Sequence, residues 1–344
     1  MYKAKEINAD VYAAAKEKWK AIAKPLGSLG ALEDIVSQIA AVQGTLNIDI
    51  GKRCVLVMCA DNGVVAEGVT QTDSSVTAVV AENIARGAAT VCIAAKTANA
   101  DVISVDVGVA RDTAGTLNKK IAYGTKNMTR EAAMMREETE KAIETGIDLV
   151  RELARQGYKI IVTGEMGIGN TTTSSAVASV LLGKEPREVT GRGAGLSTEG
   201  LKRKISVIEK AIALHNPDKS DIIDVLSKVG GLDIAAMTGV FIGGAMYGVS
   251  VVIDGFISSV AALGATRLCP KCEDFMIASH LSREGCMAEI LETLGKKAVI
   301  TAGMFPGEGA GGVMLLPLLD AAVNVFKEML TFEEIRIDAY KEFK

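Results

Sequence analysis

The sequence predicts an α/β protein with a doubly wound, mostly parallel sheet and a small helical second domain. Apolar runs of strand length alternate with longer helical patterns along most of the 344 residues. The run from Cys54 to Cys59 is continuously apolar, which is typical of a central parallel strand buried on both faces. Several runs end in glycine-rich turns that lead into a helix. This alternation indicates parallel strands joined by helical crossovers.

The elements are expected in the following order. Strands are predicted at 54–59, 102–107, 158–163, 250–253, 274–279 and 298–301. Helices are predicted at 8–22, 31–43, 74–95, 130–156, 176–182, 198–214, 221–229, 230–246, 256–263, 287–295, 313–326 and 331–343. We expect residues 1–45 to form a helical arm, residues 46–328 a large α/β domain, and residues 329–344 a helix that returns to the arm.

Composition narrows the classes of partner. Hydrophobic residues make up 49% of the chain but aromatic residues only 4%, so the core is built from small aliphatic side chains. The net charge is −4 with no long basic block, which does not favour binding to nucleic acid or to an anionic membrane. The N-terminus lacks the apolar core of a signal peptide. The apolar region 232–265 is interrupted by Asp233 and Asp254, which argues against a membrane span. A cytoplasmic protein is expected.

The cysteines and histidines give little sign of a metal centre. Six cysteines are present, and only Cys269 and Cys272 form a C-x-x-C pair. That pair could be a redox or metal site, but a turn before a strand is the favoured interpretation. Because the chain has only two histidines, a multi-histidine metal centre is excluded.

The stretch Phe305 to Gly312 places one carboxylate, Glu308, among four glycines, just before a helical pattern. Glycine lets a ligand approach the backbone closely, and the start of a helix can hold an anion. A carboxylate beside such a site could act as a general base. The alternative is a glycine turn whose glutamate faces water.

A second glycine cluster, Gly164 to Ser175, reads Gly-Glu-Met-Gly-Ile-Gly-Asn followed by hydroxyl residues, directly after a predicted strand. This order suits a phosphate or carboxylate at a helix N-terminus, although it is neither a Walker A loop nor a GxGxxG fingerprint. Ordinary capping by Asn170 is the alternative. The ligand-binding interpretation is favoured because Glu165 shares the turn.

Other candidates are less specific. Asp61 follows the first strand, where open α/β sheets bind ligands, but it could simply cap the loop. Lys24 and Lys204 could each contact an anion or lie in solvent. His280 and Ser282 follow a later strand, although a lone loop histidine is more often structural.

Five stretches in this order resemble the nicotinate mononucleotide:5,6-dimethylbenzimidazole phosphoribosyltransferases over about residues 8 to 330. They are Lys-Pro-Leu-Gly-Ser-Leu-Gly from Lys24, Ala-Asp-x-Gly-Val around Asp61, Gly-Glu-Met-Gly-Ile-Gly-Asn-Thr-Thr from Gly164, Asp-Gly-Phe from Asp254, and Gly-Glu-Gly around Glu308. The resemblance implies a Rossmann-like sheet, a small helical domain and a dimer with sites at its interface. It implies a ribotide product used for the lower ligand of cobamides, with no cofactor and no metal.

The resemblance also implies roles for individual residues. Glu308 matches the catalytic base, and Glu165 matches a second active-site carboxylate. The positions that match the mononucleotide site are Gly167, Ile168, Gly169, Asn170, Lys204, Ser282, Gly307, Gly309 and Gly311. The leaving nicotinate is a cationic pyridinium and needs no general acid. Glu165 could stabilise the positive charge that develops on the ribose, and Glu308 could take a proton from the acceptor.

Asp61 is expected among the substrate-binding residues. The departures from the family concern the acceptor pocket. The family usually has Ser at Thr70, Gln near Val79 and an aliphatic residue at Pro306, and it usually has His at Asn62. An unpartnered second benzimidazole nitrogen would cost about 1–3 kcal/mol. One branch of the family activates phenol and p-cresol as a heterodimer, so we expect a phenolic acceptor and either a homodimer or a heterodimer with a paralogous chain. Dimethylbenzimidazole, a non-catalytic subunit and a hydrolase remain the alternatives.

Overall fold

The computed structural model describes residues 2–340, and their centre is one six-stranded parallel sheet. Its strand order is β3-β2-β1-β4-β5-β6, and every neighbouring pair is parallel. The strands are β1 Arg53–Ala60, β2 Asp101–Gly108, β3 Leu117–Asn118, β4 Ile160–Met166, β5 Ser250–Ile253 and β6 Met276–Ala278. The predicted α/β class with a mostly parallel sheet is confirmed.

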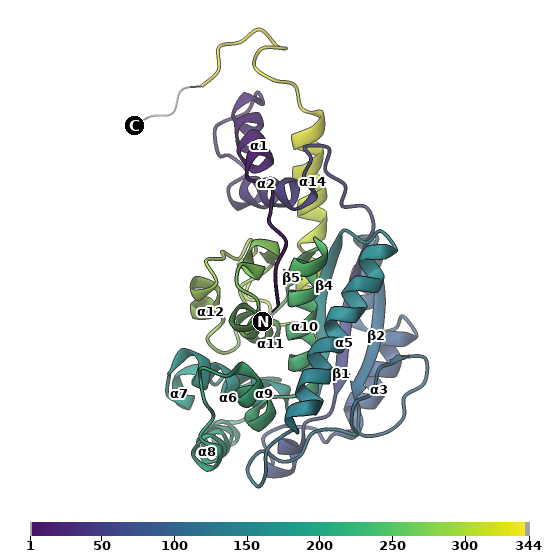
Figure 1. Ribbon diagram of the computed structural model, residues 1–344, viewed down its shortest axis with the longest axis vertical. Helices are drawn as coiled ribbons and strands as arrows, with labels where there is room; N and C mark the ends of the chain where they lie inside the picture. Colours follow the sequence, from purple (N-terminus) through teal and green to yellow (C-terminus); the bar gives the residue numbers. More distant parts are fainter. Residues whose placement is uncertain (1, 341–344) are drawn as a thin grey trace.

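Helices surround the sheet (Figure 1). The α-helices are α1 Ala9–Ala21, α2 Ala31–Gln43, α3 Ser75–Ala85, α4 Thr90–Thr97, α5 Arg136–Arg155, α6 Asn170–Leu182, α7 Pro186–Val189, α8 Thr198–His215, α9 Ile222–Val229, α10 Leu232–Tyr247, α11 Phe256–Leu268, α12 Met287–Thr293, α13 Ala310–Val313 and α14 Leu316–Glu328. The short 3₁₀ helices are η1 Gly63–Glu67 and η2 Cys272–Phe275.

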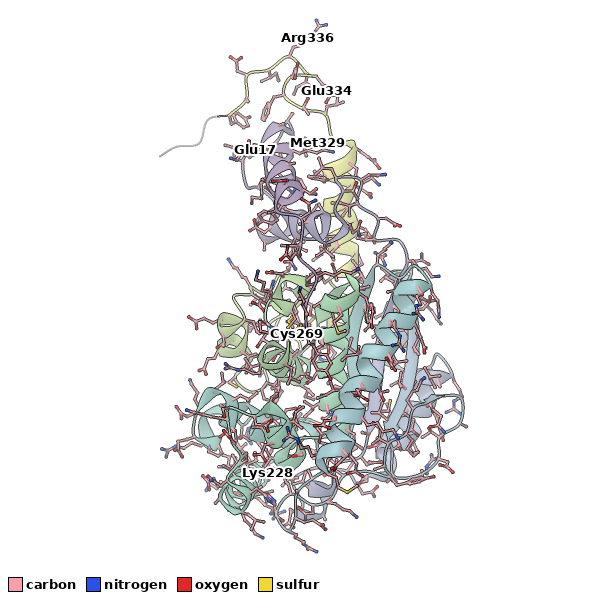
Figure 2. All side chains as sticks on the ribbon, viewed as in Figure 1. Glu17, Lys228, Cys269, Met329, Glu334 and Arg336 are labelled. Atoms are coloured by element: carbon pink, nitrogen blue, oxygen red, sulfur yellow. The ribbon has the colours of Figure 1, made fainter. Side chains whose placement is uncertain are left out.

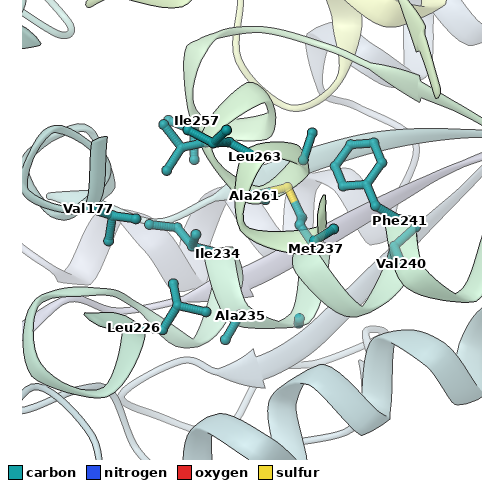
Figure 3. Packing of buried hydrophobic residues seen from close by; sticks show 14 of the residues in the cluster. Val177, Leu226, Ile234, Ala235, Met237, Val240, Phe241, Ile257, Ala261 and Leu263 are labelled. Carbon is teal, nitrogen blue, oxygen red and sulfur yellow. The ribbon is translucent and has the colours of Figure 1, made fainter. Parts of the chain in front are cut away.

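The sheet separates two hydrophobic clusters because successive side chains of a strand point to opposite faces. Along β1, Leu56 and Met58 enter one cluster, while Val55 and Val57 enter the other. Every residue of β1 is buried, as the continuous apolar run predicts. Helices α5, α6, α10 and α11 cover the first face, and α3, α4, α13 and α14 cover the second. Figure 3 shows the first cluster where Met237 and Phe241 of α10 pack among their neighbours.

The small helical unit contains α1, α2 and α14, which gather at one end of the molecule (Figure 1). The rings of Trp19 in α1 and Phe326 in α14 lie 4.9 Å apart. Arg53, which begins β1, holds Asp320 of α14 with two bonds of 2.6 and 2.7 Å. Figure 2 labels Glu17 of α1 and Met329, just after α14, at this end. The expected domain boundaries stay a prediction.

Three predicted elements differ in the structure. The expected C-terminal helix is wrong over residues 331–340, which form turns and a bridge to Ile22, while residues 341–344 lie outside the described chain. The expected strand at 298–301 is only an isolated bridge between His280 and Ile300. The expected helix at 74–95 is two helices, because Gly87 adopts a left-handed backbone with φ of 76° between α3 and α4.

Two helical stretches, Ser75–Thr97 and Ala310–Glu328, are long and apolar enough to cross a membrane. Core helices share this length and composition. Ala81 and Val91 in the first stretch and Leu316 and Leu319 in the second all pack in the cluster on one face of the sheet. Burial against the sheet accounts for the apolar composition mainly in the second stretch, of which 56% is buried, since only 33% of the first is buried.

Candidate functional site

The site is built where the parallel strands end. Asp61 follows β1, Gly167 follows β4 and Asp254 follows β5. Since these strands are parallel neighbours, their carboxyl ends meet at one edge of the sheet, where ligands bind in open α/β sheets. The fold alone therefore brings the separate glycine-rich stretches of the sequence together.

The two predicted catalytic carboxylates lie on segments in direct contact, Glu165 at the end of β4 and Glu308 in the loop before α13. A Cβ atom on Gly164, beside Glu165, would lie 2.4 Å from the carbonyl oxygen of Glu308. A Cβ atom on Gly307 would lie 3.5 Å from Oε1 of Glu165. Glycine at position 164 thus lets β4 and the loop of Glu308 approach closely, so that Glu165 and Glu308 lie at the same edge.

Glu308 is half-buried and its position is closely defined. Its Oε2 accepts a hydrogen bond of 3.2 Å from the backbone N–H of Val91 in α4. Its own backbone is left-handed, with φ of 67°, which is uncommon for a residue with a side chain and stores on the order of 1 kcal/mol of strain. Such strain is typical of residues held in place for a function.

Glu165 lies in an acidic, water-poor environment. Burial raises its pKa well above the usual range for a glutamate, and the charges of Asp233, Asp254 and Glu308 raise it further. The Asn170 amide donates a hydrogen bond to Oε2 of Glu165 and opposes this rise. A cation placed beside these carboxylates would be strongly stabilised.

Two cavities open at this edge. The first has a volume of about 190 Å³, and the second about 170 Å³. The first is lined by Glu165, Asn170, Thr171, Gly193, Ala194, Asp254, Gly255, Phe256, Ile257, Ser258, Ser282, Glu284, Phe305, Pro306 and Gly307. The second is lined by Val69, Thr70, Gln71, Thr72, Gly167, Ile168, Gly169, Asn170, Thr171, Arg192, Gly193, Ala194 and Leu196. Residues such as Asn170 and Thr171 line both.

Lys204 of α8 lies behind the cavities and contacts Thr171, a residue that lines both. Its side chain is buried, and Nζ donates to Oγ1 of Thr171 at 2.9 Å and to the carbonyl oxygen of Gly191 at 3.2 Å. Burial lowers the pKa of Lys204 to about 8. A partly desolvated ammonium beside a hydroxyl is suited to an anion such as a phosphate. Ser282 lines the first cavity from the other side.

The glycines after Glu308 have a different partner from the phosphate that the sequence analysis expected. The N–H of Gly312 donates to Oδ1 of Asp254 at 2.6 Å, and the amides of Gly309 and Gly311 also bond to this carboxylate. Burial raises the pKa of Asp254 to about 7, and these amides limit the rise. Asp254 therefore holds the loop that carries Glu308.

The remaining predicted residues are spread around the site. Ile168 and Thr70 line the second cavity, but the N–H of Ile168 donates to Thr77 at 3.1 Å and the hydroxyl of Thr70 donates to the carbonyl of Thr72 at 2.7 Å. Asp61 is buried and accepts from the N–H of Ala110 at 2.8 Å. Val79 lines neither cavity and is 49% exposed on α3.

The structure adds residues that sequence reasoning missed. Thr171 contacts Lys204. Glu284 accepts a 2.8 Å hydrogen bond from the N–H of Gly193, and this bond closes one wall of the first cavity. Asp233 lies under Asn170 at the start of α10. Asp233 does not directly follow a predicted strand, so no local pattern in the sequence predicted that it lies near the edge of the sheet.

Two further candidates turn out to be structural. Lys24 is buried and pairs with Oε1 of Glu33 at 2.5 Å, so the carboxylate that its ammonium contacts belongs to the same chain. Cys269, labelled in Figure 2, follows α11, and Cys272 begins η2 just before β6; both are buried free thiols, in agreement with the favoured turn interpretation. Within residues 2–340, no group of three or more histidine, cysteine or acidic side chains could hold a metal ion.

Known proteins resemble this chain over nearly its whole length. A family model described as phosphoribosyltransferase matches residues 4–337. A protein of Ruminiclostridium cellulolyticum, named nicotinate-nucleotide–dimethylbenzimidazole phosphoribosyltransferase, is 46% identical over 339 residues, which are 98% of this chain and 96% of that protein. A protein of the same name from Acetivibrio thermocellus is 46% identical over 322 residues, 93% of this chain and 92% of that protein.

Solved structures agree with this likeness. A crystal structure of CobT from Thermus thermophilus superimposes with a TM-score of 0.91 at 36% identity, covering 96% of this chain and 100% of that one. The chain therefore belongs to the family of nicotinate-nucleotide–dimethylbenzimidazole phosphoribosyltransferases and is an enzyme of the nicotinate-nucleotide phosphoribosyltransferase class.

Proposed function

We propose that this enzyme transfers the 5-phosphoribosyl group of nicotinate mononucleotide to an aromatic acceptor and releases nicotinate, which supplies an α-ribotide for cobamide biosynthesis. The observation that carries the proposal is the contact between the end of β4 at Glu165 and the loop of Glu308, beside two cavities whose shared residue Thr171 is held by the buried Lys204. Two carboxylates next to one buried ammonium suit a substrate with a cationic ring at one end and a phosphate at the other.

In the proposed reaction, Lys204, Thr171 and Ser282 hold the 5′-phosphate. The bond between C1′ and the pyridinium nitrogen breaks, and its electron pair neutralises the ring as nicotinate leaves. Glu165 stabilises the positive charge on the ribose as this bond lengthens. A bond then forms between C1′ and the acceptor atom, and Glu308 takes the acceptor's proton.

Two acceptor classes are candidates. The names of the relatives support dimethylbenzimidazole. The expectation of a phenol rests on Pro306, which lines the first cavity beside Glu165, and on Val79 and Thr70. Val79 lines neither cavity and the Thr70 hydroxyl is bonded to its own loop, so these two residues support a phenol less than their positions in the sequence did. A benzimidazole is therefore our first candidate and a phenol our second.

The acceptor is identified by a competition experiment. The purified enzyme is incubated with nicotinate mononucleotide and an equimolar mixture of dimethylbenzimidazole, phenol and p-cresol, and the ribotides are separated by mass spectrometry. We expect the benzimidazole ribotide to dominate. Phenolic ribotides alone would support the second candidate. Nicotinate release that does not require an acceptor would indicate a hydrolase and contradict the proposal.

Lys204→Ala is expected to raise KM for nicotinate mononucleotide by about 10- to 100-fold, because a charged hydrogen bond to the phosphate is lost. Since the pKa of Lys204 is about 8, the ammonium is present below that pH and is lost above it. The kcat/KM of the wild type should therefore fall as pH rises past about 8, and the variant should lack this fall. Lys202→Ala, on an exposed position of the same helix, is the control. An unchanged KM in Lys204→Ala would contradict this assignment.

We also propose that the enzyme acts as a homodimer, or with a paralogous chain, in the cytoplasm. Large apolar side chains are exposed on three helices that pack on the same face of the sheet: Val79 on α3, Ile93 on α4 and Leu318 on α14. A second chain would shield them from water. Sedimentation velocity of the purified chain should give the mass of a dimer, and a monomer at micromolar concentration would point to a paralogous partner.

A further inference from the structure

One amide group joins Glu165, which lines the first cavity, to the fully buried carboxylate of Asp233. Nδ2 of Asn170 donates one hydrogen bond to Oε2 of Glu165 and another, of 3.0 Å, to Oδ2 of Asp233. A primary amide carries two N–H donors, so both are used by this bridge. The bridge holds the side chain of Glu165 from one side while Oε1 lies toward Gly307.

Asp233 lies in the protein interior and lines neither cavity. Its side chain is fully buried, and its Oδ1 accepts a 3.0 Å hydrogen bond from the N–H of Ile234 at the start of α10, where the helix dipole favours a negative charge. Next to it, Ile234 belongs to the same buried cluster as Val177 of α6, which fixes α10 against α6 (Figure 3).

Two glycines make room for this carboxylate. A Cβ atom on Gly167 would lie 2.7 Å from Oδ2 of Asp233, and one on Gly231 would lie 2.6 Å from Oδ1. Gly167 lies in the loop after β4 that was assigned to substrate binding. A side chain at position 167 would collide with Asp233, so glycine is needed there for packing as well as for the approach of a ligand.

The groups that face Glu165 carry no positive charge. They are Asn170 from α6, Asp233 from α10, Asp254 after β5, Glu308 before α13 and the thiol of Cys59 from β1. Like charges in a buried site disfavour the ionisation of both partners. Burial raises the pKa of Asp233 to about 6 and that of Glu165 well above its usual range, and the charge of Asp233 adds to the rise at Glu165.

We propose that Asp233 and Asn170 are positioning residues of the transfer reaction. Asn170 orients Glu165 toward the ribose, and the negative charge of Asp233 keeps Glu165 protonated until the pyridinium of the nucleotide enters. This inference rests on the proposed function, since it requires a substrate with a positive charge. The pyridinium favours the ionised form of Glu165, so binding of nicotinate mononucleotide releases the proton of Glu165 to solvent. Glu165 then carries its charge only when a substrate is present to use it.

Proton release is measured by titrating the full-length protein with nicotinate mononucleotide in a calorimeter, in two buffers with different ionisation enthalpies. Near neutral pH we expect the wild type to release a fraction of a proton on binding. Asp233→Asn should release less at the same pH, because Glu165 is already partly ionised in the free variant. Glu165→Gln should release none from this site. The measurement does not require turnover.

The pH dependence of kcat/KM gives the second readout. The acid limb is the fall of kcat/KM at low pH. In Asp233→Asn this limb should move to lower pH by about one unit, because a like charge beside Glu165 is removed. Asn170→Ala should shift the limb to higher pH and lower kcat with little change in KM, because Glu165 loses its donor. Asp148→Asn, which removes a surface carboxylate paired with Arg151 on α5, should leave the limb unchanged.

The outcomes separate this inference from the function on which it rests. If the folded Asp233→Asn variant loses activity equally at every pH and its proton release matches the wild type, Asp233 is only a packing residue and the inference is wrong. If the wild type does not bind nicotinate mononucleotide, the proposed function fails and the inference fails with it. A shifted acid limb together with reduced proton release supports both.

Discussion

Glu308→Gln is expected to lower kcat by about 10²- to 10⁴-fold while KM for nicotinate mononucleotide changes little. A glutamine has the shape of a glutamate, and its oxygen can still accept the hydrogen bond from Val91. It cannot take a proton from the acceptor. The loss should be greater with phenol, whose pKa is about 10, than with dimethylbenzimidazole, because a benzimidazole nitrogen can attack with its lone pair before it loses a proton. Steady-state rates with each acceptor measure the difference.

The control for this variant is Glu292→Gln, which makes the same chemical change on the exposed side of α12. It should leave the rate unchanged. If Glu308→Gln retained full activity, Glu308 would not be the base. If the activity of a complex with a paralogous chain were also unaffected, the alternative of a non-catalytic subunit would be supported.

Gly239→Ala is expected to destabilise the protein by about 3 kcal/mol or more. Gly239 lies in the middle of α10, and a Cβ atom there would lie 1.9 Å from the carbonyl oxygen of Ile143 in α5. A Cβ atom on Gly146 of α5 would likewise lie 2.0 Å from the carbonyl oxygen of Ala236. Because each obstacle is helix backbone, the two helices would have to separate and leave gaps in the core between them. Urea denaturation gives the change in the free energy of unfolding.

Gly264→Ala is the matched control, since Gly264 also lies inside a buried helix, α11. Its nearest neighbours would be 3.4 Å from the added Cβ, which is ordinary contact. Here the better helix propensity of alanine should leave stability unchanged or raise it by up to about 1 kcal/mol. If Gly239→Ala and Gly264→Ala had the same effect, the close approach of α5 and α10 would not limit stability.

Much of the fold was predictable because strands and helices leave local patterns. The apolar run at β1 and the glycine-rich ends of the strands predicted a parallel sheet, and five of the six predicted strands are present. The errors lie where local pattern and tertiary contact disagree. The segment after Thr331 spaces apolar residues such as Phe332 and Ile335 as a helix does, but Thr331 instead bridges to Ile22 and its N–H bonds to Glu334.

The site was partly predictable for the same reason. Glu165 and Glu308 each stand in an unusual glycine-rich stretch, which local chemistry marks as a place for close backbone approach. Gly309 and Gly311 were assigned to phosphate because free amides at a helix start suit an anion. The anion that they contact is Asp254, a residue more than fifty positions away whose approach no local pattern describes.

The sequence by itself determined the parallel α/β class, the two glutamates and their family likeness, because periodicity, glycine turns and motifs are properties of neighbouring residues. Only the tertiary structure decided which distant groups share a site. It placed Lys204 against Thr171 behind the cavities, turned Lys24 inward toward Glu33, and joined Asp233 to Glu165 through Asn170. The physical reason is that burial and electrostatic coupling depend on distances in space, and these are set when the helices pack on the sheet.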